Sequence, residues 1–304
     1  MGRGQARAMT DLLFGTNLVA MVTPMRPDGA ICSTGVAGLV DHLVSTGCDG
    51  LVVGGTTGES PTLTALEASS LVGAVVARSA GRSRVVAGVG TYDTADSIRR
   101  AQAAAAAGAD ALLLVCPYYS RPTQAGVIAH CVAVADATEL PVMLYDVPVR
   151  TGIAFEPATL VELAGHPRIR AVKDAKGDLA AAMAVMADSS LAYYCGIDEL
   201  NLPYLASGAA GVVSVVGNVT ADRVGSLIRA VRAGDLSSGR VIARSLAPLV
   251  DAVMGTAQGA VMAKAALAEL GIIPHPTVRS PLLEATPPQV RRLAEALESI
   301  AAPA

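Results

Sequence analysis

The chain has 304 residues, of which 52% are hydrophobic and only 16% are charged, and its formal net charge is −3. A typical soluble domain has about 25% charged residues, so we infer that some surface is buried between subunits of a homo-oligomer. The charge balance and the lack of a basic run argue against a nucleic-acid partner. The five cysteines form no C-x-x-C pair, which favours free, buried thiols in a reducing compartment.

Two segments raise the question of export or membrane insertion. The start of the chain, MGRGQARAMTDLLFG, has two early arginines but no apolar core, so it does not resemble a signal peptide. Residues 200–221 carry no charge over a length that could cross a bilayer. Pro203, Gly208 and Gly211 interrupt this stretch, so a short helix, a turn and a buried strand fit it better. The sequence predicts a cytoplasmic protein with no membrane partner.

Eight apolar runs lie between residues 17 and 216. Three of them repeat one pattern: a glycine, a few small or polar residues, and then the apolar run. The glycine predicts a left-handed helix C-cap, and the run predicts a strand that is buried on both faces, as in a parallel sheet. In chain order the runs are NLVAMVT from Asn17, STGCDGLVVGG from Ser45, SRVVAGVG from Ser83, AAGADALLLVC from Ala106, PVMLYDVP from Pro141, IRAVKD from Ile169, LAYYCG from Leu191 and ASGAAGVVSVV from Ala206.

Helical stretches rich in alanine, leucine and valine separate these runs. Examples are residues 64–80, with Thr64 as N-cap and Glu67 completing a capping box, and residues 94–107. Eight alternating units predict a (β/α)8 TIM barrel with a C-terminal helical appendage. We expect an N-terminal extension at 1–14, the barrel at 15–232, and a segment at 233–304 with helices near 236–254, 258–270 and 287–300.

Lysine is scarce in this chain, and its placement points to a catalytic site. The only three lysines are Lys173, Lys176 and Lys264, among 23 basic residues. Lys173 ends an apolar strand at the edge where barrel enzymes carry their chemistry. Burial there favours the neutral amine, which can form a Schiff base with a ketone, whereas arginine stays protonated. The alternative for Lys173 is a surface salt bridge. Lys176 lies in the following loop, and we interpret it as a solvated lysine.

Hydroxyl groups follow several neighbouring strand ends. Tyr145, Tyr119, Thr56 and Thr57 could transfer the protons that Schiff-base chemistry requires, although the two threonines could equally form a plain turn. Arg150 could hold a substrate carboxylate in bidentate fashion, and backbone N–H groups of the glycine-rich loop before the next helix could hold another. The four histidines are scattered, so we expect no catalytic metal.

Four of these stretches closely resemble motifs of the dihydrodipicolinate synthase (4-hydroxy-tetrahydrodipicolinate synthase) family, within the pyruvate-dependent class I aldolases. They are GGTTGESPTL, PYYSRP, YDVPVRTG and AVKDAKGD, and the resemblance covers nearly the whole chain. It implies that Lys173 forms an imine with pyruvate and that Tyr145 relays protons. It also implies that Thr56 links Tyr145 to Tyr119, and that Tyr119 reaches into a neighbouring subunit of a homotetramer. No other cofactor is implied.

The resemblance also implies a substrate pocket. Thr57 would bind the pyruvate carboxylate, Arg150 would bind the carboxylate of L-aspartate 4-semialdehyde, and Gly196 and Val213 would line the pocket. The product would enter diaminopimelate and lysine biosynthesis. The alternatives are a sugar-acid aldolase or lyase of the same superfamily, like N-acetylneuraminate lyase or keto-deoxy-gluconate aldolase, or a catalytically silent keto-acid sensor.

Departures from the family pattern bear on substrate detail and regulation. Asp146 follows the tyrosine where asparagine is common. At the four positions where lysine-inhibited members carry polar groups, this chain has residues that imply weak or absent inhibition by L-lysine. These are Ala65, Ala68, Tyr92 and Asp96.

Overall fold

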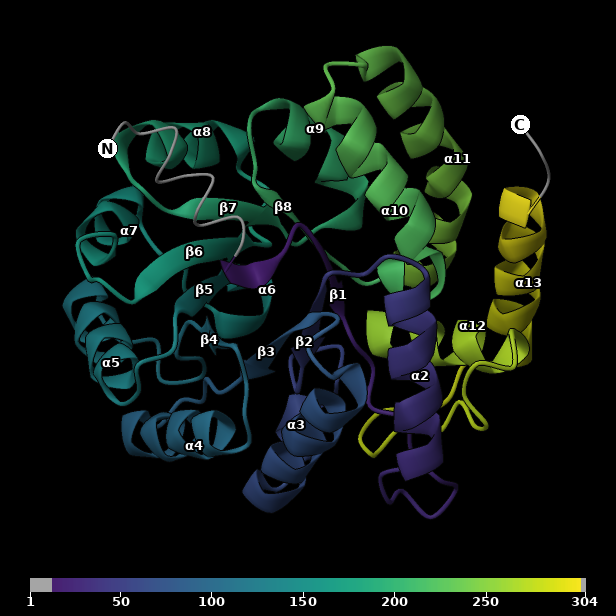
Figure 1. Cartoon of the computed structure of the whole chain (residues 1–304), viewed down its shortest axis with the longest axis horizontal. Coiled ribbons are helices and arrows are strands. Elements are labelled where there is room, and N and C mark those ends of the chain that lie inside the picture. The colour runs from purple at the N-terminus through teal and green to yellow at the C-terminus, as the bar shows by residue number, and fades with distance from the viewer. Residues whose placement is uncertain (1–12, 302–304) are drawn as a thin grey trace.

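The computed structural model describes residues 13–301, and they form a closed barrel of eight parallel strands (Figure 1). The strands pair in sequence order and β8 closes on β1. Helices lie outside the strands because a parallel connection must cross back over the sheet. The strands are β1 (Asn17–Ala20), β2 (Gly50–Val53), β3 (Arg84–Gly88), β4 (Ala111–Val115), β5 (Val142–Asp146), β6 (Ile169–Asp174), β7 (Ala192–Cys195) and β8 (Gly211–Ser214). All eight predicted strands and the barrel fold are confirmed.

Helix α3 begins with the predicted capping box. The Glu67 N–H donates to the Thr64 hydroxyl at 3.2 Å, and the Thr64 N–H donates to the Glu67 carboxylate at 2.9 Å. Such a cap stabilises a helix by about 1 kcal/mol. The helices of the barrel are α2 (Ser33–Ser45), α3 (Ala65–Ser79), α4 (Thr94–Ala106), α5 (Gln124–Asp136), α6 (Pro148–Thr151), α7 (Pro157–Leu163), α8 (Leu179–Asp188), α9 (Asn201–Ala206) and α10 (Gly217–Arg232), with 3-10 turns η1 (Ser60–Thr62) and η2 (Asp198–Leu200).

The repeated glycines end helices, as their pattern predicted. Gly47, Gly108 and Gly208 have φ values of 85°, 89° and 101°. This left-handed region is open to glycine at little cost. Each glycine therefore turns the chain from a helix into the next strand.

Three further helices follow the barrel: α11 (Leu236–Met254), α12 (Gly259–Glu269) and α13 (Pro287–Ala301). Helix α11 packs against α10 and α13, and α12 contacts α10, α11 and α13 (Figure 1). Their contacts bury Leu249, Met262 and Leu293 completely. The predicted helices near 236–254, 258–270 and 287–300 are confirmed, whereas the division into three units remains a prediction. Most of the proposed extension at 1–14 lies outside the described residues.

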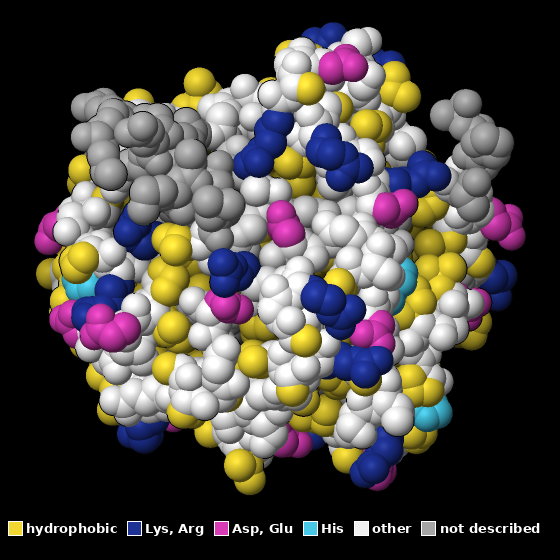
Figure 2. All heavy atoms as spheres, viewed as in Figure 1, with side chains coloured by type: hydrophobic (Ala, Val, Ile, Leu, Met, Phe, Trp, Pro, Cys, Tyr) yellow, Lys and Arg dark blue, Asp and Glu magenta, His cyan; other side chains and the backbone are white. Residues whose placement is uncertain are grey.

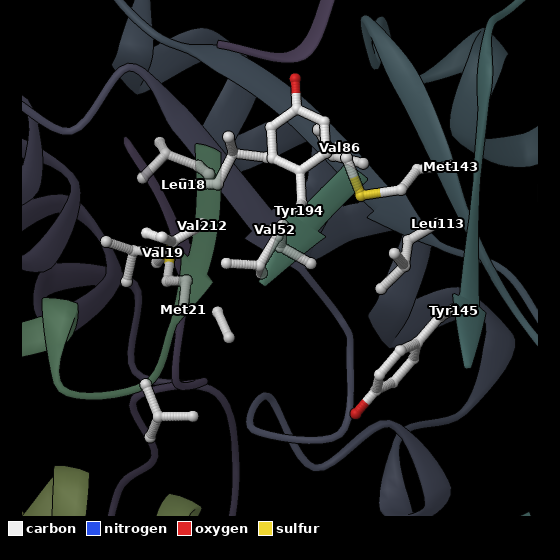
Figure 3. Close-up of a cluster of buried hydrophobic side chains, with 14 of the residues drawn as sticks. Leu18, Val19, Met21, Val52, Val86, Leu113, Met143, Tyr145, Tyr194 and Val212 are labelled. Atoms are coloured by element: carbon white, nitrogen blue, oxygen red, sulfur yellow. The ribbon is translucent and has the colours of Figure 1, made fainter. Parts of the chain in front are cut away.

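Aliphatic side chains and one tyrosine fill the barrel away from its C-terminal end (Figure 3). Leu18, Val52, Val86 and Leu113 are each at most 3% exposed, and burying such a side chain contributes about 1.5–3 kcal/mol. Tyr145 lies apart from this group, at the arrowhead end of β5 (Figure 3). The packed interior therefore supports polar chemistry only at the rim where the strands end.

The helices and the surface can be compared with the expectation that the chain binds neither a membrane nor a nucleic acid. Between residues 13 and 301, no single helix is both long and apolar enough to cross a membrane; only the pair α11 and α12, bent by 113°, passes together by length and composition. Charged side chains are scattered over the face in Figure 2, with hydrophobic side chains between them. This face shows no broad basic patch of the kind that binds nucleic acid.

Candidate active site

Lys173 and Tyr145 lie side by side at the ends of two neighbouring strands. They are register partners on β6 and β5, and the Lys173 Nζ is 4.2 Å from the centre of the Tyr145 ring. Lys173 is 4% exposed and Tyr145 is 6% exposed. Within the described chain, no carboxylate forms an ion pair with Lys173. The prediction that Lys173 is buried, and not a surface lysine in a salt bridge, is confirmed.

Gly196 has no side chain and so leaves the space that the Lys173 side chain occupies. A Cβ at Gly196 would lie 3.0 Å from Lys173 Cε, 3.1 Å from Lys173 Cγ and 3.0 Å from the Asp174 carbonyl oxygen. Any side chain here would therefore press on the lysine. Val213, which is 1% exposed, is on the adjoining strand β8, one residue beyond the pair that Val212 forms with Cys195. Gly196 thus follows β7, the strand beside Lys173, and Val213 lies on β8, the next strand beyond it.

Two tyrosines are register neighbours of Lys173, but their hydroxyls point to opposite ends of the barrel (Figure 3). The Tyr194 hydroxyl donates to the Gly15 carbonyl at 2.9 Å, at the N-terminal end. The Tyr145 hydroxyl points toward the C-terminal end, where the loops begin. Tyr145 is therefore the tyrosine placed to exchange protons with a group bound to Lys173.

The loop after β2 forms a compact turn that carries Thr56 and Thr57. It packs closely on β3, since a Cβ at Gly88 would lie 2.3 Å from the Gly54 carbonyl oxygen. The Gly58 carbonyl accepts a hydrogen bond from the Thr23 hydroxyl at 2.7 Å. Thr57 is 7% exposed. The turn is thus built into the barrel rim and does not project from it.

Glu59 ends this turn in a left-handed conformation, with φ 59° and ψ 38°. That geometry costs a residue other than glycine about 1–3 kcal/mol and persists only where the surroundings hold it. The Glu59 carboxylate forms an ion pair with Lys264 of α12, and both side chains are almost fully buried. Its second oxygen accepts the Arg279 N–H at 2.8 Å. Burial lowers the pKa of Lys264, and the Glu59 carboxylate opposes that shift.

Two carboxylates follow the Tyr145–Lys173 pair in the same register. Asp146 and Asp174 are 1% and 2% exposed. Burial raises the pKa of Asp146 to about 6, and it also raises the pKa of Asp174. The Lys176 Nζ lies 3.6 Å from Asp146 and its side chain is 18% exposed. The interpretation of Lys176 as a solvated lysine is therefore wrong, because its ammonium group compensates a buried acid.

Two predicted residues lie on the exposed part of the rim. Tyr119 is 91% exposed and has a φ of 67°, and Arg150 is exposed on α6. Neither forms a hydrogen bond or an ion pair with Lys173 within the described chain. No hydrogen bond among residues 13–301 joins Tyr145 to Thr56. The relay in which Thr56 links Tyr145 to Tyr119 therefore remains a prediction.

Comparison with known proteins agrees with this geometry. The family model of the dihydrodipicolinate synthetase family matches residues 13–300. A 4-hydroxy-tetrahydrodipicolinate synthase of Mycolicibacterium paratuberculosis is 51% identical over 281 residues, which are 92% of this chain and 93% of that protein. The chain belongs to the dihydrodipicolinate synthetase family.

Solved structures of the family superpose along nearly the full chain. A dihydrodipicolinate synthase from Bacillus anthracis is 38% identical with a TM-score of 0.91, over 94% of this chain and 98% of that one. The Acinetobacter baumannii enzyme, solved in complex with pyruvate, is 33% identical with a TM-score of 0.91, over 94% and 98%. Members of this family are Schiff-base-forming lyases that need no external cofactor, and this chain is one of them.

The described part of the chain contains no group of three or more histidine, cysteine, aspartate or glutamate side chains arranged to hold a metal. All five cysteines are free and buried. Burial raises the pKa of the Cys116 thiol to about 12, so Cys116 stays a protonated, unreactive thiol near neutral pH. The prediction that most of the cysteines are free, buried thiols is confirmed.

Sequence reasoning assigned no role to three residues at this rim. Glu59 and Lys264 are far apart in the chain, and only the scarcity of lysine drew attention to the second. Arg121 lies against α6, since its Nε is 2.6 Å from the place of a Cβ at Gly152. The sequence signal for Arg121 was its position two residues after Tyr119, within the motif PYYSRP.

Proposed function

We propose that the chain condenses pyruvate with L-aspartate 4-semialdehyde, the reaction of 4-hydroxy-tetrahydrodipicolinate synthase in diaminopimelate and lysine biosynthesis. The observation that carries this proposal is Lys173, a buried lysine at a strand end that has no carboxylate partner. Relatives that are about 50% identical to the chain bear the name of this synthase. The pyruvate complex of the A. baumannii enzyme supports pyruvate as the first substrate.

The amine of Lys173 attacks the keto carbon of pyruvate, and the keto oxygen leaves as water after it takes up two protons. Loss of a proton from the methyl group turns the imine into an enamine, whose carbon attacks the aldehyde of the second substrate. Cyclisation by the amino group of that substrate then displaces Lys173. Tyr145, whose ring lies against the amine, is the group that moves these protons.

The turn after β2 holds the pyruvate carboxylate. The N–H groups of Gly58 and Glu59 are used inside the turn, by the carbonyls of Gly55 and Thr56. The Thr57 N–H makes no hydrogen bond to any residue between 13 and 301. An unpaired N–H on a nearly buried residue suits an anionic ligand, because buried donors are otherwise satisfied.

Arg150 binds the carboxylate of the second substrate as that substrate enters. Its exposed guanidinium on α6 suits a ligand that arrives after the imine has formed. Val149 beside it is 87% exposed, so it does not close the pocket within one chain. Gly196 and Val213 form the opposite wall.

A second copy of the chain completes the site. Tyr119 is 91% exposed and held in a left-handed conformation, which is unusual for a large aromatic residue. Packing against a neighbouring subunit would bury this ring and place its hydroxyl beside the neighbour's Tyr145. A homotetramer also agrees with the low charged fraction of the sequence. The cytoplasmic location remains a prediction, which the five free cysteines favour.

Borohydride reduction in the presence of pyruvate tests the proposal. Reduction of an imine fixes the pyruvate carbons to the lysine, and peptide mass spectrometry then locates the adduct. We expect one adduct per chain, on Lys173, and none when pyruvate is omitted. An unmodified Lys173, or an equal adduct on Lys176, contradicts the assignment.

The second substrate needs its own assay. With pyruvate present, we expect turnover with L-aspartate 4-semialdehyde and none with aldoses or N-acetylmannosamine. The Arg150→Met variant should raise the KM for the semialdehyde by about tenfold to a hundredfold while leaving borohydride trapping of pyruvate unchanged. Turnover with a sugar aldehyde instead would place the chain among the sugar-acid aldolases.

A further inference from the structure

Lys264 is a fully buried cation that the proposed mechanism does not use. It lies on α12, outside the barrel strands, and is 0% exposed. Its Nζ forms the ion pair with Glu59 and donates to the Thr277 carbonyl at 2.7 Å. Glu59 follows Thr57 by two residues, so this contact connects the C-terminal segment directly to the turn that carries the two threonines.

The Glu59 carboxylate is held from two sides. One oxygen meets Lys264, and the other accepts the backbone N–H of Arg279 at 2.8 Å. Both partners come from the part of the chain that follows the barrel. Because the Glu59 N–H also donates to the Thr56 carbonyl at 3.1 Å, fixing Glu59 fixes the geometry of the threonine pair.

Arg279 also forms hydrogen bonds just beyond the same turn. Its guanidinium donates to the Thr62 carbonyl at 2.6 Å and to the Gly29 carbonyl at 2.9 Å, and it pairs with Glu67. The turn is therefore connected to the C-terminal segment at Glu59 and again just beyond it. Since Glu59 holds an otherwise unfavourable left-handed conformation, these contacts determine where the turn lies.

We propose that Lys264 is a positioning residue for the reaction: through Glu59 it orients Thr56 and Thr57 toward the imine on Lys173. This rests on the proposed roles of the two threonines. A side chain without charge at position 264 would leave a buried carboxylate unpaired, and the turn would move to solvate it. The Thr57 N–H would then no longer meet the pyruvate carboxylate.

The competing explanation is that the pair only attaches α12 to the barrel. An attachment of that kind affects the melting temperature but not the pyruvate dependence of a folded enzyme. A positioning role affects pyruvate binding and imine formation at temperatures well below melting. The two explanations therefore differ in a measurement on folded protein.

The test measures borohydride trapping on Lys173 against pyruvate concentration, together with the KM for pyruvate, in Lys264→Met. We expect the pyruvate concentration for half-maximal trapping to rise by about tenfold to a hundredfold, the size expected when a distant change misplaces a binding group. The double variant Glu59→Gln with Lys264→Met buries no charge, so it should recover most of the wild-type pyruvate dependence.

Leu293→Ala is the matched control for stability. Leu293 is 0% exposed on α13 and lies far in sequence from the turn, so its truncation destabilises the C-terminal helices without removing a charge. We expect a lower melting temperature with unchanged pyruvate dependence. If Lys264→Met behaves like Leu293→Ala, with a lower melting temperature and wild-type pyruvate dependence, the positioning role is overturned.

Glu59→Gln covers the case in which Lys264→Met does not fold. The amide keeps the shape of the side chain, and the neutral form of Lys264 remains accessible because burial already favours it. We expect a rise of about three- to tenfold in half-maximal pyruvate, and wild-type dependence here equally overturns the inference. If wild-type Lys173 itself forms no adduct, the proposed function fails; if it does and both variants match it, only the role of Lys264 fails.

Discussion

Two buried lysines of this chain differ in what faces them. The Lys264 Nζ meets the carboxylate of Glu59 and a backbone carbonyl. The Lys173 Nζ lies over the face of the Tyr145 ring and its methylene chain runs beside Gly196, with no paired carboxylate in the described chain. Both side chains are at most 4% exposed, so burial alone does not distinguish them.

The difference matches the two roles proposed above, a positioning cation for Lys264 and a nucleophile for Lys173. A buried carboxylate holds the proton on its lysine partner, because an ionised pair is far better than one buried charge. An amine that must attack a ketone has to release its proton, and an opposing carboxylate would hinder that step. The chain therefore pairs Lys264 and leaves unpaired Lys173, the lysine that we propose reacts with pyruvate.

The substitution Lys173→Arg tests the difference between the two lysines and should have the largest effect. Arginine keeps the charge and much of the volume but cannot supply a neutral amine. We expect the barrel to stay folded by circular dichroism while kcat falls by about a thousandfold or more, as when a nucleophile is lost. The control Lys176→Arg keeps a cation beside Asp146 and should stay within about threefold of wild type. Wild-type turnover in Lys173→Arg would rule out Lys173 as the nucleophile.

A second substitution tests whether the glycine beside Lys173 matters. In Gly196→Ala the new Cβ would lie 3.0 Å from Lys173 Cε, so the amine must shift. We expect kcat/KM for pyruvate to fall by about tenfold to a hundredfold. Gly73→Ala is the matched control, because its Cβ would find only one atom, at 4.0 Å, and it should leave kcat/KM unchanged. Equal activity in both variants would show that Lys173 does not need the space.

The smallest expected effect concerns Asp146, one of the two buried acids that follow the Tyr145–Lys173 pair. Burial raises the pKa of Asp146 in the folded chain to about 6, from its ordinary value of 3.8. The unfolded chain therefore loses this proton first, and Asp146 favours the folded state most below pH 4. That contribution, about 3 kcal/mol at most, is lost as the pH rises through 6. Asp146→Asn should remove this part of the decline in melting temperature between pH 4 and 7.

The exposed Asp188→Asn substitution is the control for that measurement. Asp188 lies at the end of α8, and its removal should leave the pH dependence of the melting temperature as in wild type. A decline that is identical in Asp146→Asn and wild type would mean that another group accounts for it.

The barrel could be predicted because its signals are local. Gly47, Gly108 and Gly208 each end a helix and precede an apolar run, and Thr64 with Glu67 starts a helix through contacts three residues apart. Such short-range patterns survive in a single sequence. Lys173 followed from the same patterns, because the end of a strand in this fold is also the place of its chemistry.

The ion pairs could not be predicted, since they join residues that are distant in the chain. Glu59 meets Lys264 across 205 positions, and nothing in the spacing of either residue indicates the partner. Lys176 was misjudged for the same reason: its neighbours in sequence are Asp174 and Asp178, but its ion-pair partner is Asp146 on another strand. Contacts of this kind depend on how the elements pack.

The contact between Glu59 and the C-terminal segment has a consequence for biosynthesis. Every strand of the barrel lies before residue 215, but Lys264 and Arg279 are translated after all of these strands. Until they are made, the turn that holds Thr56 and Thr57 has a buried acid without its partner. A chain synthesised only to the end of β8 can thus have all eight strands and still lack the contacts that hold this turn, so the turn is completed only after the barrel strands have been made.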